Sequence, residues 1–282
     1  MEKYLRIKNQ TICYQERNET KTKTIFFIHG NSGSALSWSN QLSDPLLAEY
    51  RLVAFDLPAH GNSSGFENEA TYNLLSIAEF MTEALQACLQ NDDYIIVGFS
   101  LGTNIVAEML QLNIYPKGIV LISPCIVGEG YPLHGICLPG FNADVLFSDD
   151  CSYEALESFI NLACFTKNND DFTMLIKDYN RVKSPFRSML LKTALDGKIS
   201  DEINLLNSYT SGPVLLMFGQ EEKIVKPGYL DNAPLPIWNN TIYKIPQASH
   251  FVHMDQPRAT NQLLASYCRN YLHSFTPVAY NT

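Results

Sequence analysis

The sequence lacks the features that mark several classes of protein. Its 20 Lys and Arg stand against 29 Asp and Glu, a formal net charge of -9, and no basic cluster occurs. The electrostatic driving force for binding nucleic acid or an anionic membrane is therefore missing. No apolar run approaches the roughly 20 residues of a membrane-spanning helix, and the charged start does not resemble a signal peptide. We expect a cytoplasmic, soluble protein that binds neither nucleic acid nor membrane.

Metal-binding and cofactor-binding patterns are also absent. The seven cysteines are odd in number and form no C-x-x-C pair, which favours reduced, mostly buried thiols over disulfides. The six histidines are dispersed, with no H-E-x-x-H spacing. Neither G-x-G-x-x-G nor G-x-x-x-x-G-K-[ST], the phosphate-binding loops, occurs. We expect no metal and no cofactor.

Strand-like and helical patterns alternate along most of the 282 residues. Strands are expected at 5–8, 11–15, 24–28, 52–55, 94–97, 118–122, 214–218 and 241–245. From 24–28 onward these runs are nearly continuous in apolar residues, which is typical of strands buried on both faces. Amphipathic helices are expected at 74–89 and 258–272. The alternation predicts an α/β fold with a mainly parallel sheet.

The alternation stops between residues 124 and 207, where no convincing strand appears. Apolar residues recur at helical spacing within 153–163 and again within 190–195. We predict a core domain formed by 1–123 and 208–282, with a helical cap of 124–207 inserted into it. Such a cap is expected to leave some aromatic side chains lining an apolar pocket, the candidates being Phe141, Phe147, Phe159, Phe165 and Phe186.

Residues 94–102 read YIIVGFSLG and place the motif G-x-S-x-G between an apolar strand and a helical pattern. Nucleophilic chemistry needs a serine on such a tight strand-to-helix turn, where its hydroxyl stands clear of the backbone. Gly98 and Gly102 would then be positions where a Cβ clashes across the turn. The free N–H groups of the following helix favour negative charge at the same point. Ser100 is the predicted nucleophile, and the alternative is an ordinary glycine-flanked loop.

A serine nucleophile requires a general base on a later loop. His250 meets this requirement, because it lies in the loop 246–251 just after the apolar run 242–245. We predict that His250 is the base. The alternatives are His253, which lies closer to the next helix, and a histidine that only packs at that helix start.

The histidine in turn needs a carboxylate that accepts its Nδ1–H and fixes its tautomer. This acid is expected in the loop after strand 214–218, where Glu222 is the third residue after Gly219. Glu222 is the predicted acid, Glu221 is the competing candidate and Asp231 a more distant one. The alternative is that the two glutamates form a solvated pair without a role.

Two backbone N–H groups are expected to hold the negative oxygen of the reaction. One belongs to Leu101, directly after the nucleophile, and the other to Asn31, in the loop 29–34 that follows an apolar strand. That loop is rich in small residues, which let backbone approach a ligand. His29 and the segment 56–61 also end strands, and we interpret both as mainly structural because their roles are already filled.

Five segments in this order resemble the α/β-hydrolase superfamily: 29–34 (HGNSGS), 56–63 (DLPAHGNS), 98–102 (GFSLG), 219–222 (GQEE) and 249–251 (SHF). The resemblance covers nearly the whole chain. It implies an α/β-hydrolase fold, with a mainly parallel eight-stranded twisted sheet flanked by helices and an inserted helical cap.

The sequence departs from the usual superfamily pattern at three positions. Ala59 and Ser249 stand where relatives usually carry glycine, and Glu222 stands where most carry aspartate. The H-G-N-S opening together with a glutamate acid resembles the metal-independent N-acyl-homoserine lactone hydrolases. This closer resemblance implies a triad of Ser100, Glu222 and His250, oxyanion donors at Asn31 and Leu101, and a place for Phe99 beside the substrate. Gly30 and Phe147 are the other residues that we predict to bind the substrate.

We therefore expect a serine hydrolase that cleaves a carboxylic ester or lactone through an acyl-enzyme. Cleavage of acyl-homoserine lactones, and hence quorum quenching, is the narrower hypothesis. The expected partner is a small apolar acyl ester or lactone, bound by a monomer or homodimer. The alternatives are other chemistry on the same fold (C–C hydrolase, thioesterase, lyase, oxygenase or perhydrolase) and a small-molecule receptor on a hydrolase scaffold.

Overall fold

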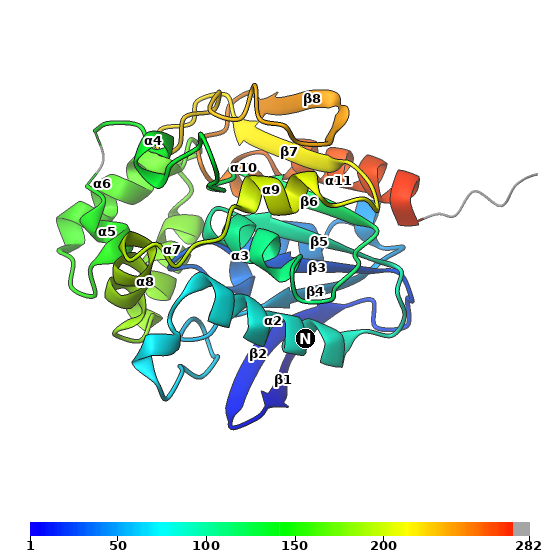
Figure 1. Ribbon diagram of the computed structural model, residues 1–282, viewed down its shortest axis with the longest axis horizontal. Helices are drawn as coiled ribbons and strands as arrows, with labels where there is room; N and C mark the ends of the chain where they lie inside the picture. The colour runs from blue at the N-terminus through cyan, green and yellow to red at the C-terminus, as the bar shows by residue number, and fades with distance from the viewer. Residues whose placement is uncertain (141, 273–282) are drawn as a thin grey trace, which may run out of the picture.

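A twisted eight-stranded sheet forms the centre of the computed structural model, which describes residues 1–140 and 142–272 (Figure 1). The strands are β1 (Glu2–Ile7), β2 (Gln10–Arg17), β3 (Thr24–Ile28), β4 (Arg51–Phe55), β5 (Tyr94–Phe99), β6 (Gly118–Ile122), β7 (Val214–Gly219) and β8 (Ile237–Ile245). Their order across the sheet is β1-β2-β4-β3-β5-β6-β7-β8. Only the β1–β2 and β2–β4 pairs are antiparallel, so the predicted mainly parallel fold is confirmed.

The inner parallel strands are apolar because both of their faces are covered. Every residue of β3, β4, β5, β6 and β7 is buried. Strand β8 is different, and here the prediction of a strand buried on both faces is wrong. It begins at Ile237 rather than Thr241, and residues 239–241 are exposed. The reason is its position at the edge of the sheet, where it pairs only with β7.

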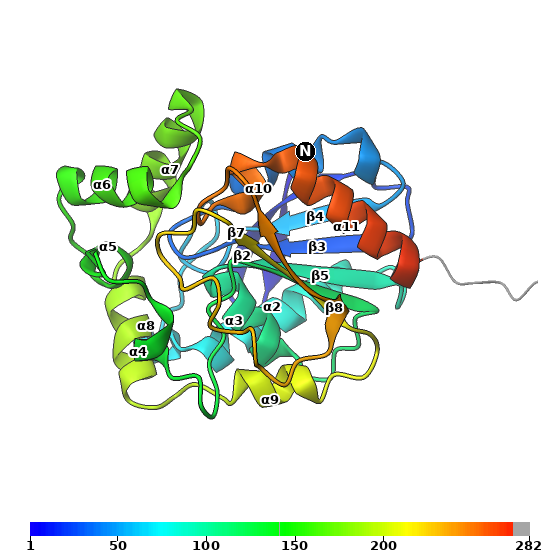
Figure 2. The same ribbon diagram turned by 90° about the horizontal axis from the view of Figure 1, so that it is seen from above.

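Helices cover both faces of the sheet. They are α1 (Ser39–Leu42), α2 (Leu74–Cys88), α3 (Leu101–Met109), α4 (Leu133–Ile136), α5 (Asp144–Phe147), α6 (Tyr153–Ala163), α7 (Asn169–Arg181), α8 (Phe186–Leu195), α9 (Glu202–Asn207), α10 (Val252–Asp255) and α11 (Pro257–Leu272), with 3-10 turns at Ala35–Trp38, Pro45–Leu47 and Glu69–Thr71. Helices α2, α3 and α9 lie together on one face, and α1, α10 and α11 pack on the other (Figures 1 and 2). None of the helices in the described part of the chain is long and apolar enough to cross a membrane.

The chain between β6 and β7 is helical and, apart from Phe141, which lies outside the described residues, contains no strand. Helices α4 to α8 gather beyond the carboxyl ends of the parallel strands (Figure 2). Helix α9 packs instead against α3, so the last residues of the predicted cap segment contact the core. The loops that follow β3, β5, β6, β7 and β8 lie on the same side of the sheet as α4–α8 (Figure 2). In parallel sheets, ligands bind at the carboxyl ends of the strands, where these loops lie.

Candidate active site

Ser100 sits on a strained turn between β5 and α3. Its φ of 50° and ψ of −121° place a non-glycine residue in the positive-φ region, a conformation that costs about 1–3 kcal/mol and persists at functional sites. The turn is tight on all sides. A Cβ on Gly98 would lie 2.6 Å from the carbonyl oxygen of Gly102, and one on Gly102 would lie 2.3 Å from that of Ile28. A Cβ on Gly30 would lie 2.9 Å from the Cβ of Ser100, so the loop after β3 also needs glycine at this position.

These contacts predict a large loss of stability for Gly102→Ala. The new methyl group would overlap a backbone oxygen of β3, which cannot move without disturbing the sheet, so we expect the free energy of unfolding to fall by at least about 3 kcal/mol. Urea unfolding measures the effect. Gly135→Ala is the matched control, because its Cβ would lie 3.6 Å from its nearest neighbour in α4 and should raise stability by up to about 1 kcal/mol. Equal effects of the two substitutions would contradict this description of the turn.

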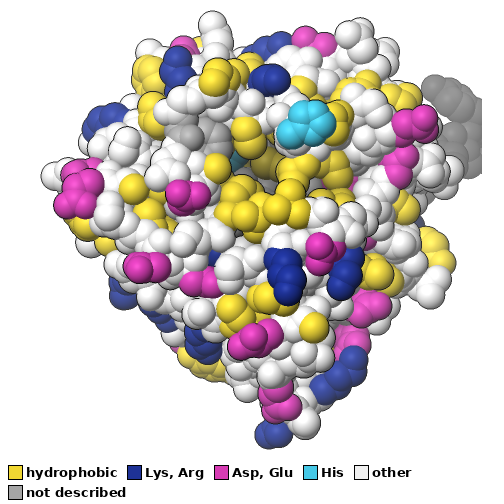
Figure 3. Space-filling view, turned by 60° about the vertical axis from the view of Figure 1, so that its left-hand side comes forward, with side chains coloured by type: hydrophobic (Ala, Val, Ile, Leu, Met, Phe, Trp, Pro, Cys, Tyr) yellow, Lys and Arg dark blue, Asp and Glu magenta, His cyan; other side chains and the backbone are white. Residues whose placement is uncertain are grey.

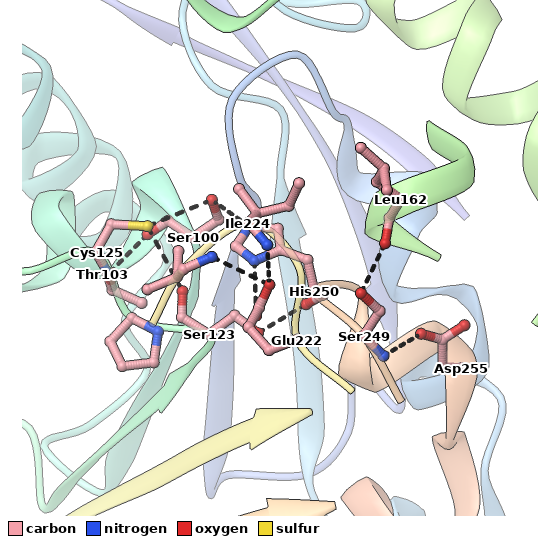
Figure 4. Close-up of polar contacts among 12 residues, drawn as sticks. Ser100, Thr103, Ser123, Cys125, Leu162, Glu222, Ile224, Ser249, His250 and Asp255 are labelled. Atoms are coloured by element: carbon pink, nitrogen blue, oxygen red, sulfur yellow. Dashed lines mark hydrogen bonds and ion pairs between the residues drawn. The ribbon is translucent and has the colours of Figure 1, made fainter. Parts of the chain in front are cut away.

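Three side chains from distant parts of the sequence meet in one hydrogen-bonded chain (Figure 4). The Nε2 atom of His250 lies 2.9 Å from the Oγ of Ser100. The Nδ1 atom of the same ring lies 3.0 Å from Oε2 of Glu222. Glu222 lies in the loop after β7 and His250 in the loop after β8, and both are buried. A hydroxyl, an imidazole and a carboxylate in this order can move a proton away from the serine as it attacks.

Glu222 is held in its ionised form. Burial alone would raise the pKa of this carboxyl. The adjacent His250 and hydrogen bonds from the backbone N–H groups of Ile224 and Val225, at 2.8 and 3.2 Å, outweigh burial and lower the pKa below its ordinary value. A charged carboxylate that accepts these bonds is suited to orient His250 and to stabilise its protonated state.

The competing carboxylates lie elsewhere. Glu221, the neighbouring candidate, accepts a hydrogen bond from the backbone N–H of Ala248 at 3.1 Å and does not reach the imidazole. Asp231 is half-exposed and pairs with Lys244 at 3.5 Å. Of the three predicted candidates, only Glu222 contacts His250.

His253, the rival base, is fully buried away from Ser100. Its ring lies over the indole of Trp38, with 4.3 Å between the ring centroids. Neither ring nitrogen has a hydrogen-bond partner in the described part of the chain. Burial, together with the nearby His250, lowers the pKa of His253 to about 3, so it is neutral and packs as an aromatic side chain.

The two residues predicted to supply oxyanion donors, Asn31 and Leu101, both lie beside Ser100. Leu101 is the first residue of α3, and Asn31 follows β3; both line the same cavity as Ser100. Within residues 1–140 and 142–272, the backbone N–H groups of Asn31 and Leu101 have no protein acceptor. The side chain of Asn31 faces away, toward α5, and donates from Nδ2 to the carbonyl of Leu146 at 2.7 Å. Two free N–H groups beside a nucleophile can stabilise a developing oxyanion.

His29 and the segment 56–61 brace the loops, in agreement with their structural interpretation. The backbone N–H of Leu57 donates to Nε2 of His29 at 2.9 Å, and that of Ser32 donates to Nε2 of His60 at 3.1 Å. Burial lowers the pKa of both imidazoles, so they remain neutral acceptors. Asp56 accepts bonds from backbone N–H groups of two neighbouring loops.

Sequence reasoning missed the residues that hold the triad in place. Ser123, directly after β6, donates to the backbone carbonyl of His250 at 2.7 Å. Thr103 donates to the carbonyl of Ser100 at 2.6 Å and accepts from the backbone N–H of Cys125 at 3.0 Å (Figure 4). Nothing in the sequence pattern marks Ser123. Thr103 could have been found as the hydroxyl three residues after the nucleophile.

The cap segment is tied to the histidine loop by a residue that the resemblance marks as unusual. Ser249 stands where relatives usually have glycine, and its hydroxyl donates to the carbonyl of Leu162 in α6 at 2.8 Å. Asp255, which the sequence marks only as a helix start signal, accepts from the backbone N–H groups of Ser249, Phe165 and Thr166 at 2.8–2.9 Å. These bonds join the end of α6 to the loop that carries His250.

A cavity lies between the triad and α4, α5 and α8. It has a volume of about 100 Å³. Its lining is mostly apolar and consists of Asn31, Leu74, Ser100, Leu101, Asn104, Cys125, Leu133, Ile136, Cys137, Leu146, Phe147, Leu190, Ala194, Ile199, Ile224, Val225 and His250. Figure 3 shows a hollow bordered by hydrophobic side chains on the face formed by the cap segment. Such a site suits a small apolar ligand with few polar groups.

The predicted pocket residues are only partly brought to this cavity. Phe147 lines it. Phe159 and Phe186 are buried in the core, and Phe165 is 44% exposed. The predicted substrate-binding residues Phe99 and Gly30 lie beside the triad without lining the cavity; the ring of Phe99 packs 5.2 Å from that of His250. Phe141 lies outside the described residues. Within those residues no three His, Cys, Asp or Glu side chains gather to hold a metal ion.

A buried carboxyl joins α7 to the loop after β3 and makes stability depend on pH. Ser34 donates to Oδ2 of Asp178 at 2.5 Å, while Oδ1 has no hydrogen bond within the described residues and lies 4.0 Å from Arg181. Burial raises the pKa of Asp178 to about 6, although the bond from Ser34 opposes the rise. From about pH 4 to pH 6 the folded protein therefore keeps a proton that the unfolded chain has released, and stability falls as the pH rises through this range.

Asp178→Asn should remove the fall in stability that the carboxyl of Asp178 causes between about pH 4 and pH 6. At about 1.4 kcal/mol for each pKa unit, the free energy of unfolding of the variant relative to wild type should increase by about 2–3 kcal/mol between pH 4 and pH 7. Urea unfolding at each pH measures the difference, with the exposed Asp196→Asn as control. A difference that stays constant across this range would show that the carboxyl does not titrate there.

The fold and these contacts define a class of protein. The sheet order, a serine on a strand-to-helix turn, an acid after β7 and a histidine after β8 are the arrangement of α/β hydrolases. The family described as alpha/beta hydrolase fold matches residues 23–257, and the chain belongs to this family.

Relatives and solved structures agree with this assignment. The chain is 26% identical to protein ABHD8 of Homo sapiens over 247 residues, covering 86% of this chain and 54% of ABHD8, so it spans about half the length of that relative. It is 25% identical over 275 residues to the uncharacterized hydrolase YugF of Bacillus subtilis (strain 168), covering 92% of this chain and 94% of YugF.

Among solved structures, the N-acyl homoserine lactonase AidH, complexed with N-butanoyl homoserine, superposes with a TM-score of 0.88 at 21% identity, covering 97% of this chain and 98% of AidH. The esterase RhEst1 from Rhodococcus sp. ECU1013 has a TM-score of 0.77 at 20% identity, covering 96% and 98% of the two chains. At these identities the likeness shows the shared fold.

Proposed function

We propose that this protein is a serine hydrolase that cleaves carboxylic esters or lactones. The observation that carries the proposal is the continuous hydrogen-bonded chain from Ser100 through His250 to Glu222 at the wall of an apolar cavity. The matches to hydrolases and esterases support the same class of reaction.

The proposed reaction has two steps. The Oγ of Ser100 attacks the carbonyl carbon while its proton passes to Nε2 of His250, and the carbonyl oxygen becomes an oxyanion held by the N–H groups of Asn31 and Leu101. His250 then gives the proton to the leaving oxygen, and the C–O bond breaks to leave an acyl-enzyme. Water, deprotonated by His250, attacks the ester carbon and releases the acid with the serine restored.

We propose lactones as the preferred substrates, and acyl-homoserine lactones in particular. The glutamate at position 222, Asn31 beside the cavity and the structural likeness to AidH support this choice. The cavity volume of about 100 Å³ favours a short acyl chain, because drug-sized ligands occupy sites of about 300 Å³ or more. In this proposal residues 124–207 form a cap that closes the cavity over the substrate.

A substrate comparison tests the proposal. The purified protein is incubated with 4-nitrophenyl butanoate, N-butanoyl-homoserine lactone and the matching thioester and amide, and the products are separated by mass spectrometry. We expect ring-opened N-butanoyl-homoserine, which closes again on acidification. Release of butanoate from the lactone would instead mean cleavage of the amide bond. Tight binding without turnover of any substrate would favour a receptor and contradict the proposal.

A further inference from the structure

Asn104 is a polar residue in the mostly apolar wall of the cavity, beside Ser100, His250 and Asn31. It lies on the first turn of α3, four residues after Ser100, and both residues line the cavity. The residue is 6% exposed. It is not part of the triad or of the predicted oxyanion site.

Both amide hydrogens of Asn104 are already used. Nδ2 donates to the backbone carbonyl of Cys125 at 2.9 Å and to Oε2 of Glu202 at 2.8 Å. Since a carbonyl oxygen can only accept, the bond to Cys125 fixes which end of the amide is Nδ2. The amide therefore cannot turn over to present its N–H groups to the cavity.

The carboxyl group that holds Asn104 is itself immobile. Glu202 in α9 is fully buried, and its Oε2 also accepts from the backbone N–H of Val127 at 2.8 Å. The amide of Asn104 is therefore hydrogen-bonded both to α9, through Glu202, and to the loop after β6, through Cys125. This support fixes the side-chain angle of Asn104, which is how a binding group is kept ready for its ligand.

The carbonyl oxygen of Asn104 is left unused. In the described part of the chain Oδ1 accepts no hydrogen bond, yet it is not among the polar atoms sealed inside the protein. With Nδ2 directed at Cys125 and Glu202, the opposite end of the amide faces the cavity that Asn104 lines. An acceptor that is open to the cavity is free to bond to water or to a ligand, and a bound ligand that displaces the water without supplying a donor loses that hydrogen bond.

We propose that Oδ1 of Asn104 accepts a hydrogen bond from an N–H group that the substrate carries on the carbon next to its reacting carbonyl. The inference rests on the proposed function, because it takes Ser100 as the point of attack. Ser100 and Asn104 line the same cavity, so a substrate attacked by Ser100 lies beside Asn104. An N–H two bonds from the carbon under attack is the donor nearest to the reacting carbonyl. The substrate class is therefore α-acylamino lactones and esters.

This assignment makes Asn104 a specificity-determining residue. Plain esters and lactones fit the same cavity but leave Oδ1 without a donor. A missing neutral hydrogen bond in such a site costs about tenfold in kcat/KM. Residues that line the cavity with apolar atoms alone cannot produce this discrimination.

The test compares two lactones that differ in one group. N-butanoyl-homoserine lactone is paired with an analogue in which CH2 replaces the amide N–H. We expect wild-type protein to prefer the amide by about tenfold in kcat/KM. In Asn104→Leu the preference should fall to near one, because only the rate with the amide decreases. Leu190→Ala, which alters the cavity without a polar atom, should change both rates by the same factor.

Several outcomes would overturn the inference. Equal rates of wild type with the two lactones would show that Oδ1 does not recognise the N–H and would reject the inference. An unchanged preference in Asn104→Leu would also reject it. If that variant does not fold, as judged by thermal unfolding, Asn104→Ser replaces it. If wild type opens neither lactone, the proposed function fails; calorimetric binding of the same pair to Ser100→Ala then decides whether the N–H is recognised.

Discussion

Replacing Ser100 with alanine should lower kcat for ester or lactone hydrolysis by about a million-fold, as expected when the nucleophile of a triad is removed. The reason is geometric. His250 would have no hydroxyl to deprotonate within 2.9 Å, and no acyl-enzyme could form. Stopped-flow or long-time assays with 4-nitrophenyl butanoate measure the loss.

The substitution should leave the fold intact. Alanine keeps the Cβ that Gly30 accommodates, so thermal unfolding should match that of wild type. Ser39→Ala, at an exposed serine, is the matched control and should keep full activity. Activity near the wild-type level in Ser100→Ala would reject the proposed nucleophile.

Glu222→Gln should lower kcat by about ten-thousand-fold, the size of effect seen when a triad acid becomes an amide. A glutamine can donate its N–H to Nδ1 of His250, which puts the ring proton on Nε2. The ring then cannot take the proton of Ser100. Steady-state kinetics measures the loss. Glu221→Gln is the matched control, because the carboxylate of Glu221 accepts a hydrogen bond from the backbone of Ala248 and does not contact His250.

The same pair of variants separates catalysis from stability. The pKa of Glu222 is lowered in the folded protein, so its contribution to stability is present above its unfolded pKa and is lost as the pH falls through the lower, folded value. Glu222→Gln should therefore change the acid limb of unfolding. If Glu221→Gln were the inactive variant, the acid would have been assigned one residue off.

The sequence was most informative where backbone geometry restricts the residue type. At the nucleophile turn, only glycine fits beside the carbonyl oxygens at positions 98 and 102, so the motif G-x-S-x-G predicts its own structure. The apolar inner strands were likewise predictable, because a strand covered on both faces has no polar side. The edge strand β8 was mispredicted because Ile242, Tyr243 and Ile245 in the predicted run 241–245 resemble a buried strand, although only Ile245 of this run is buried.

Long-range contacts outside the recognised motifs could not be predicted. The choice between Glu221 and Glu222 depends on how the loop after β7 turns, and adjacent residues give the same local signal. Ser123 donates a hydrogen bond to His250, 127 positions later in the chain. Asp255 accepts one from Phe165, 90 positions earlier. Contacts of this kind leave no periodic pattern in the sequence. Asn104 appeared in the sequence only as a polar residue in an apolar helix, and its partners Cys125 and Glu202 come from other elements.

The most direct test of the account is to trap the acyl group. Wild-type protein is mixed with 4-nitrophenyl butanoate, quenched in acid within milliseconds, digested and analysed by mass spectrometry. The account predicts a butanoyl group on the peptide that contains Ser100, and no such adduct in Ser100→Ala. Release of nitrophenol at the wild-type rate by Ser100→Ala, or a butanoyl group on another residue that turns over, would contradict it.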